Sequence, residues 1–160
     1  MNRRHFLVSS AVSALALMFP LQALAAKPMF DYSDVPVHEL ELIEQAMDVG
    51  EVYKFSLPEK TSLFGIEPSA VSNLGGLRDL VQEFALYYGS RDLRNRVRFL
   101  IAIRKKLDER FGRNNISAQL AWMNGHEPLL GCSVRDLMNA QHYMELYRVV
   151  QFMGCEVETV

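Results

Sequence analysis

Residues 90–111 read SRDLRNRVRFLIAIRKKLDERF, and this stretch decides the fold. Ser90 is a common helix-capping residue, and the apolar residues that follow recur every three or four positions, as on the buried face of an amphipathic helix. Gly112 comes next and is typical of a helix end. The stretch therefore predicts one long helix. Its expected buried residues are Leu93, Val97, Leu100, Ile101, Ile103 and Leu107, and its expected outward residues are Arg94, Arg98, Lys105 and Asp108.

Weaker patterns on both sides of this helix predict further helices. Apolar residues at helical spacing predict a helix over 37–49, which Gly50 ends. Residues 51–57 alternate apolar and polar side chains, which favours a short strand or an extended segment, and residues 58–76 are rich in turn formers. Other helices are expected over 77–88, 116–123 and 143–153, and a short one up to residue 140, which begins at Ser133 because Ser133 and Asp136 have the spacing of a capping box with Asp in place of the usual Glu. The sequence predicts a mainly α-helical, compact domain of about five to six helices, with at most one short strand or extended segment.

The length of 160 residues suits one domain with a substantial core rather than two ordinary domains. No internal repeat and no long linker interrupts the sequence. We expect a signal peptide at 1–25, an N-terminal helix with a turn-rich segment at 26–76, and a helical domain at 77–160. The last two segments are expected to form one compact unit.

The first 25 residues have the pattern of an export signal. A positive start precedes a mostly apolar run over 6–19, and a small-x-small pattern that signal peptidase accepts follows. The run is shorter than the ~20 residues that span a bilayer, so we expect only transient membrane contact during export. The residues that carry the pattern are Arg3, Arg4, Ala23 and Ala25.

An Arg-Arg pair followed by Phe-Leu resembles the twin-arginine type of bacterial signal, which exports proteins already folded. A Sec-type signal with an accidental Arg pair is the alternative. We expect a periplasmic protein, or a cytoplasmic one if the start codon is misread.

Charge is small overall and unevenly distributed. The sequence has 17 Lys and Arg against 19 Asp and Glu, and loss of the signal's two arginines leaves a net charge of −4. This argues against nucleic acid as the main partner, because such proteins neutralise phosphates with an excess of Lys and Arg. Residues 91–113 nevertheless contain nine cations and three carboxylates, a local charge of +6. This basic run predicts a docking face for an acidic partner or, alternatively, only the solvated side of a long helix.

Patterns for catalysis and metal binding do not occur in the sequence. His38, His126 and His142 have no second ligand at the spacing of motifs such as H-E-x-x-H, and no nucleophile-elbow or phosphate-cradling motif is present. Cys132 and Cys155 lack C-x-x-C spacing, so they are either a disulfide formed in an oxidising compartment or two free thiols. We therefore expect no enzymatic activity, no cofactor and no metal site.

Residues 96–154 resemble a known family in the order and spacing of several short motifs. The run from Arg96 to Phe111 has the form RV-x-x-L-x-x-I-x-x-x-L-x-x-x-F, and Trp122 follows in a short segment. Further matches are Pro128, Leu129, Gly131, Ser133, Asp136, Leu137, Met138, Leu146, Tyr147 and Val149. Together they resemble the C-terminal toxin-binding domain of bacterial antitoxins grouped as Xre/MbcA/ParS, with Cys132 in place of a second loop glycine.

The resemblance implies a helical module that binds a partner protein and plugs its active site without catalysing a reaction. The chain is then an inhibitor or adaptor of a toxin-like protein. Its expected partner-binding residues are Arg94, Arg98, Lys105, Trp122, His126, Gly131, Ser133 and Arg135. The alternative is an accessory subunit of a twin-arginine-exported oxidoreductase. A neighbouring gene for a RES-type toxin would favour the first function, and one for a flavin or molybdenum oxidoreductase the second. The oligomeric state is left open.

Overall fold

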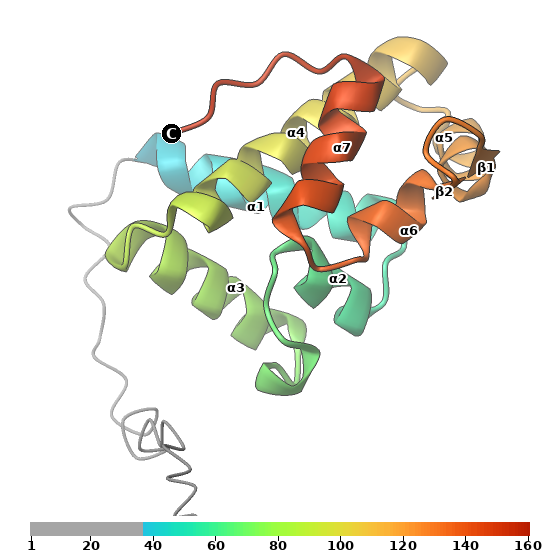
Figure 1. Ribbon diagram of the computed structural model, residues 1–160. Coiled ribbons are helices and arrows are strands. Elements are labelled where there is room, and N and C mark those ends of the chain that lie inside the picture. Colours follow the sequence, from blue (N-terminus) through green and yellow to red (C-terminus); the bar gives the residue numbers. More distant parts are fainter. Residues whose placement is uncertain (1–36) are drawn as a thin grey trace, which may run out of the picture. The chain divides into compact units, whose positions relative to one another are not determined.

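The computed structural model describes residues 37–160, which lie within a compact unit that spans 33–160 (Figure 1). The expected export signal, with Arg3, Arg4, Ala23 and Ala25, lies outside the described residues. In the part described, no helix is both long enough and apolar enough to span a membrane.

Helices dominate the described residues, which confirms the predicted mainly α-helical class. The α-helices are α1 (Val37–Val52), α2 (Leu57–Leu63), α3 (Leu74–Gln82), α4 (Arg91–Phe111), α5 (Ile116–Asn124), α6 (Val134–Met138) and α7 (Tyr143–Met153). Two shorter turns are the 3-10 helix η3 (Pro68–Ala70) and the π-helix η4 (Glu83–Tyr87). Strands β1 (His126–Glu127) and β2 (Cys132–Ser133) form a small antiparallel hairpin, in which His126 lies opposite Ser133.

Helix α4 is the centre of the fold, where it packs against α1 and α7 (Figure 1). The Ser90 hydroxyl accepts a hydrogen bond from the Leu93 amide at 3.3 Å, and Gly112 ends the helix with a φ of +86°. Of the predicted inward residues, Ile101 alone is only half-buried. Phe99 and Arg96 are also buried, because α7 and the α6–α7 turn close over that side of the helix.

The strand or extended segment expected over 51–57 is not formed. Helix α1 continues to Val52 and α2 begins at Leu57, with a tight turn between them. Tyr53 and Phe55 are both buried although Lys54 between them is exposed, so the alternation reflects a turn that places two rings in the core. The alternating burial at these positions therefore comes from a turn and not from a β-strand.

Candidate partner-binding surfaces

The structure separates the eight predicted partner-binding residues into two groups. Arg94, Arg98 and Lys105 lie on α4, where their spacing of four and seven residues places them along one face of the helix. We call these three residues the basic stripe. The other five lie on α5, the β1–β2 hairpin and α6.

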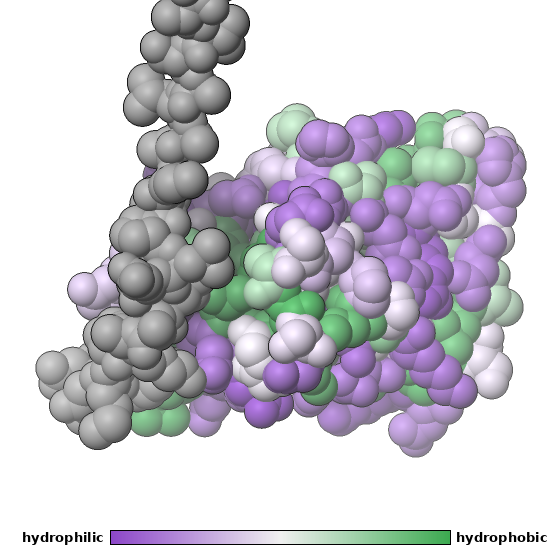
Figure 2. Space-filling view, turned by 90° about the horizontal axis from the view of Figure 1, so that it is seen from below, coloured by the Kyte–Doolittle hydropathy of each residue, from purple (hydrophilic) through white to green (hydrophobic). Residues whose placement is uncertain are grey.

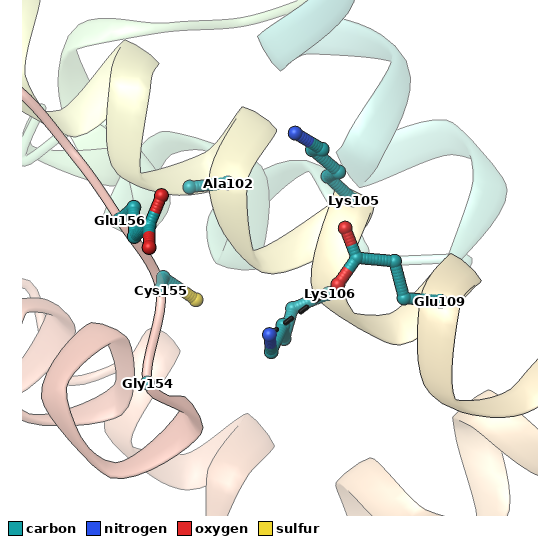
Figure 3. Close-up of a pocket in the computed structure, with 7 residues that line it drawn as sticks. All are labelled: Ala102, Lys105, Lys106, Glu109, Gly154, Cys155 and Glu156. Carbon is teal, nitrogen blue, oxygen red and sulfur yellow. Dashed lines mark ion pairs between the residues drawn. The ribbon is translucent and has the colours of Figure 1, made fainter.

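The basic stripe borders a hollow of about 490 Å³ between α4, the start of α1 and the last residues of the chain. Its walls include Leu42 and Ile101, and the stripe contributes Arg98 and Lys105. A second hollow, of about 270 Å³, shares Lys105 with the first and extends toward the end of α7. In Figure 3, Lys106 and Glu109 lie across this second hollow from Cys155.

An extended tail, residues 155–160, forms the other side of the hollows. The Cys155 amide donates to the Val150 carbonyl at 3.0 Å, and the Val160 amide donates to Asn95 Oδ1 at 2.9 Å. No hydrogen bond joins residues 156–159 to another described residue, although Val157 packs half-buried against the core. The tail is therefore held at its two ends and bridges the hollow between them.

The β1–β2 hairpin presents an ordered, exposed loop. The Leu130 and Gly131 amides both donate to the Glu127 carbonyl, at 3.0 and 2.9 Å, and Gly131 has a φ of +76° that favours glycine. Leu129 is 83% exposed at this turn, and His126 is also exposed. The hairpin thus exposes the apolar side chain of Leu129 to water on an ordered backbone.

Ser133 lies at the base of the hairpin, where it is the cap of helix α6. Its hydroxyl accepts from the Asp136 amide at 3.0 Å, and its own amide donates to the Asp136 carboxylate at 3.2 Å. This is the capping box that the spacing of Ser133 and Asp136 predicts. The hydrogen bonds from Ser133 lower the pKa of the Asp136 carboxyl. With 8% of its surface exposed, Ser133 positions α6 behind the loop.

Arg135 points inward and joins α6 to the α1–α2 turn. Its guanidinium pairs with the two Glu59 carboxylate oxygens at 3.1 and 3.2 Å, and lies 4.3 Å from the centre of the Phe55 ring. It also donates to the Tyr53 and Lys54 carbonyls at 3.4 and 3.3 Å. Arg135 therefore has an internal structural role, and its contact with a partner stays a prediction.

Burial of Glu59 by itself would raise the pKa of that carboxyl. The hydrogen bonds from Arg135 and from Ser56 outweigh this effect and lower the pKa to about 2. Asn139 donates a further hydrogen bond to the same carboxylate at 3.0 Å. Glu59 is thus ionised at neutral pH and forms the acceptor at the centre of this cluster.

Trp122 is half-buried in an aromatic cluster that joins α5 to α4 and α7. Its ring lies parallel to Phe152 with centroids 6.4 Å apart, and 5.8 Å from the Phe111 ring. The Arg110 guanidinium covers the Trp122 ring at 4.8 Å. Trp122 therefore stabilises the packing of three helices, and its side chain is only partly exposed.

Both cysteines are free thiols in the structure, so the candidate disulfide between Cys132 and Cys155 is not formed. Cys132 lies in strand β2 and Cys155 in the tail beyond α7. Burial raises the pKa of the Cys155 thiol, which keeps that thiol protonated at neutral pH.

An aromatic group on the π-helical turn η4 was not predicted as a surface feature. The exposed rings of Phe84 and Tyr87 lie 5.5 and 4.9 Å from that of Tyr88. Three aromatics before Gly89 are the sequence signal, but Phe84 and Tyr88 lie four residues apart and so also fit one face of the helix expected over 77–88. The face seen from below in Figure 2 is mostly hydrophilic around a hydrophobic middle.

Within residues 37–160, no three His, Cys, Asp or Glu side chains lie close enough together to hold a metal ion. His38 and His126 lie on separate elements, and both side chains are exposed. Comparisons with protein-family models, with curated proteins and with solved structures give no match for this chain.

Proposed function

We propose that this protein is an exported, non-catalytic helical module that binds a partner protein and acts as its inhibitor or adaptor. The observation that carries the proposal is Leu129, which is held 83% exposed at the turn of an ordered hairpin. Large apolar side chains at the centre of an interface contribute much of its binding energy, and an ordered loop loses little entropy on binding. Such a loop fits a concave site on a partner.

The resemblance to antitoxin toxin-binding domains supports the same proposal. The resembling segment, residues 96–154, folds as consecutive elements in mutual contact: α4 with α5 and α7, and α6 with α5 and α7. The hairpin leaves this unit between α5 and α6, and Arg148 of α7 donates to the Leu130 carbonyl at 3.5 Å. Helices α5, α6 and α7 thus hold the loop in place. A loop that inserts into the active site of a partner as an inhibitor needs such support.

An accessory subunit of an exported oxidoreductase is the second candidate, which the Arg-Arg-x-Phe-Leu sequence favours because twin-arginine export carries proteins already folded. Site-specific photo-crosslinking separates the two functions. A photo-reactive phenylalanine analogue replaces Leu129 in the full chain, expressed in the host cell, and a matched control replaces the exposed Glu41 of α1. Mass spectrometry then identifies the adducts.

We expect one abundant adduct from position 129 and none of that protein from position 41. If the adduct is a toxin-like enzyme, its activity should fall on addition of the wild-type chain but not of Leu129→Asp. If it is an oxidoreductase subunit, the accessory function is the correct one. Identical adducts from both positions, or none from position 129, would overturn the protein-binding proposal.

Export has its own test, a double change of Arg3 and Arg4 to lysine followed by cell fractionation. The twin-arginine pattern predicts that the wild-type chain reaches the periplasm and that the variant stays in the cytoplasm. A variant that is still exported indicates the Sec route. A wild-type chain found only in the cytoplasm overturns export and leaves the conventional antitoxin role.

A further inference from the structure

We propose that the basic stripe of Arg94, Arg98 and Lys105 binds an extended acidic segment of the partner protein in the hollow beside α4. The inference rests on the proposed function only in taking the partner to be a protein. It adds a second contact surface, distinct from the hairpin, and states the chemistry that this surface recognises.

The first observation is how the cations of α4 are paired. Three of them have a carboxylate within their own helix: Arg96 with Asp92 at 3.0 Å, Arg104 with Asp108 at 3.1 Å, and Lys106 with Glu109 at 3.3 Å. The basic stripe has no ion pair with any residue in 37–160. Of the other α4 cations, Arg91 donates to the Val160 carbonyl and Arg110 covers the Trp122 ring, so the stripe is the part of the helix where three cations that are unpaired within residues 37–160 share one face.

The second observation is that the stripe contains buried nitrogen atoms without acceptors. Arg94 Nε and Arg98 Nη1 are inaccessible to water and make no hydrogen bond to any described residue. A buried donor without an acceptor is costly, and a carboxylate is the acceptor that a guanidinium prefers. Arg98 lines the larger hollow, so a small movement of its side chain toward a carboxylate bound there would give this nitrogen an acceptor.

The dimensions of the stripe suit an extended peptide. Arg94 and Lys105 are separated by about 16 Å along the helix, at ~1.5 Å per residue. About five residues of extended chain cover the same length, at ~3.3 Å per residue. Because Leu42, Ile101 and Val157 line the hollow beside the cations, a segment that alternates acidic and apolar side chains fits best.

The tail shows that this side of α4 accommodates such a chain. Its sequence, Glu156-Val157-Glu158, alternates acidic and apolar residues, and it lies extended along the hollow with Val157 against the core. Glu156 and Glu158, together with Glu109 of the adjoining hollow, disfavour a nucleic acid, because its continuous phosphates would face these carboxylates. An acidic peptide meets the same carboxylates, but its apolar side chains can also cover Leu42, Ile101 and Val157, which a phosphate backbone cannot do.

The test uses the full chain and a dye-labelled peptide, Glu-Val-Glu-Val-Glu-Val, in fluorescence anisotropy at physiological ionic strength. The matched probes are the same peptide with Gln in place of Glu, and a single-stranded oligonucleotide of equal charge. The stripe variant is Arg98→Gln with Lys105→Gln. The control variant, Lys54→Gln with Arg113→Gln, removes the same charge from exposed positions that line neither hollow.

We expect the acidic peptide to bind, the Gln peptide to bind at least about tenfold more weakly, and the stripe variant to lose at least about tenfold in affinity. The control variant should lose less than about twofold. Thermal unfolding by circular dichroism confirms that both variants are folded. The variant Arg98→Glu with Lys105→Glu should, in addition, bind a Lys-Val-Lys-Val-Lys-Val peptide that the wild-type chain does not bind.

Absence of peptide binding, equal losses in the two variants, or tighter stripe-dependent binding of the oligonucleotide would each overturn the inference. The crosslink at Leu129 is a separate readout. If Leu129 captures a partner but the stripe binds no acidic peptide, this inference fails and the proposed function stands. If the peptide binds but Leu129 captures nothing, the hairpin proposal fails and the stripe remains an acidic-peptide site.

Discussion

Two sets of arginines in this protein differ in what surrounds their guanidinium groups. Arg96 and Arg135, which we call the internal arginines, direct their nitrogens at carbonyls and carboxylates of other elements. Arg94 and Arg98 of the basic stripe each keep a buried nitrogen for which the described residues offer no acceptor. The count of arginines therefore says little about function, because the supply of acceptors decides which arginines stabilise the fold and which remain available for a partner.

The largest expected effect comes from Arg96→Ala. Arg96 is 3% exposed and donates to the Gln141 carbonyl at 2.6 Å and to the Leu63 carbonyl at 3.4 Å. Its loss leaves both carbonyls with a missing donor and opens a cavity, so we expect destabilisation by about 3 kcal/mol in urea unfolding. Arg98→Ala on the same helix should cost less than about 0.5 kcal/mol. Equal losses of stability in the two variants would contradict the distinction between the internal arginines and the basic stripe.

The second largest effect is expected from Glu59→Gln, which removes the carboxylate that pairs with Arg135, and this effect on stability depends on pH. The pKa of Glu59 is about 2 in the folded protein and near its ordinary value of 4.5 when unfolded. A lowered carboxyl pKa stabilises the fold above the unfolded value, and this contribution is lost as the pH falls from about 4.5 to about 2. We expect Glu59→Gln to be about 2 kcal/mol less stable than wild type at neutral pH, with the difference shrinking across that window.

The measurement for Glu59 is a series of urea unfolding curves between pH 7 and pH 2. Glu51→Gln is the matched control, because Glu51 is exposed and, among residues 37–160, pairs only with Lys60. If the difference in the free energy of unfolding between Glu59→Gln and wild type stays constant down to pH 2, the cluster does not depend on an ionised Glu59.

Gly131→Ala should give a smaller effect, of about 1 kcal/mol. The residue has a φ of +76°, which an L side chain adopts only with strain, whereas an added Cβ would meet no atom within 4 Å. The loss of stability thus comes from backbone strain at the hairpin turn. Leu129→Ala should change the free energy of unfolding by less than about 0.5 kcal/mol. Thermal unfolding of both variants measures the difference. A larger loss for Leu129→Ala would show that this leucine packs within the fold rather than serving a partner.

Local features of the sequence predict α4 and the start of α6 well. Ser90 and Gly112 bound α4, and Ser133 with Asp136 caps α6, because each signal acts within a few residues of the chain. The inward role of Arg135 is not predictable in this way, since Glu59 lies 76 residues away in sequence. Its partners exist only after α6 has packed against the α1–α2 turn.

The same limit explains the other differences from expectation. Residues 51–57 alternate in burial because a turn points Tyr53 and Phe55 into the core, and only tertiary structure distinguishes this from a strand. For the basic stripe, spacing predicts a shared face and also the ion pairs of Asp92, Asp108 and Glu109, which lie three or four residues from their cations. Spacing does not show the hollow, because the tail that forms its other side is distant in sequence.

The smallest expected effect, and the only one with the opposite sign, is on the stability of the stripe variant. Arg94 and Arg98 are like charges four residues apart on one helix, an arrangement that destabilises a helix by about 0.2–0.5 kcal/mol. Arg98→Gln with Lys105→Gln should therefore raise the free energy of unfolding by a few tenths of a kcal/mol at low salt. Since salt screens such repulsion, the gain should vanish near 0.5 M sodium chloride. Urea unfolding at both salt concentrations measures it, with Lys54→Gln and Arg113→Gln as the control. A loss of stability at low salt would mean that the fold itself satisfies these cations, and the stripe would then belong with the internal arginines.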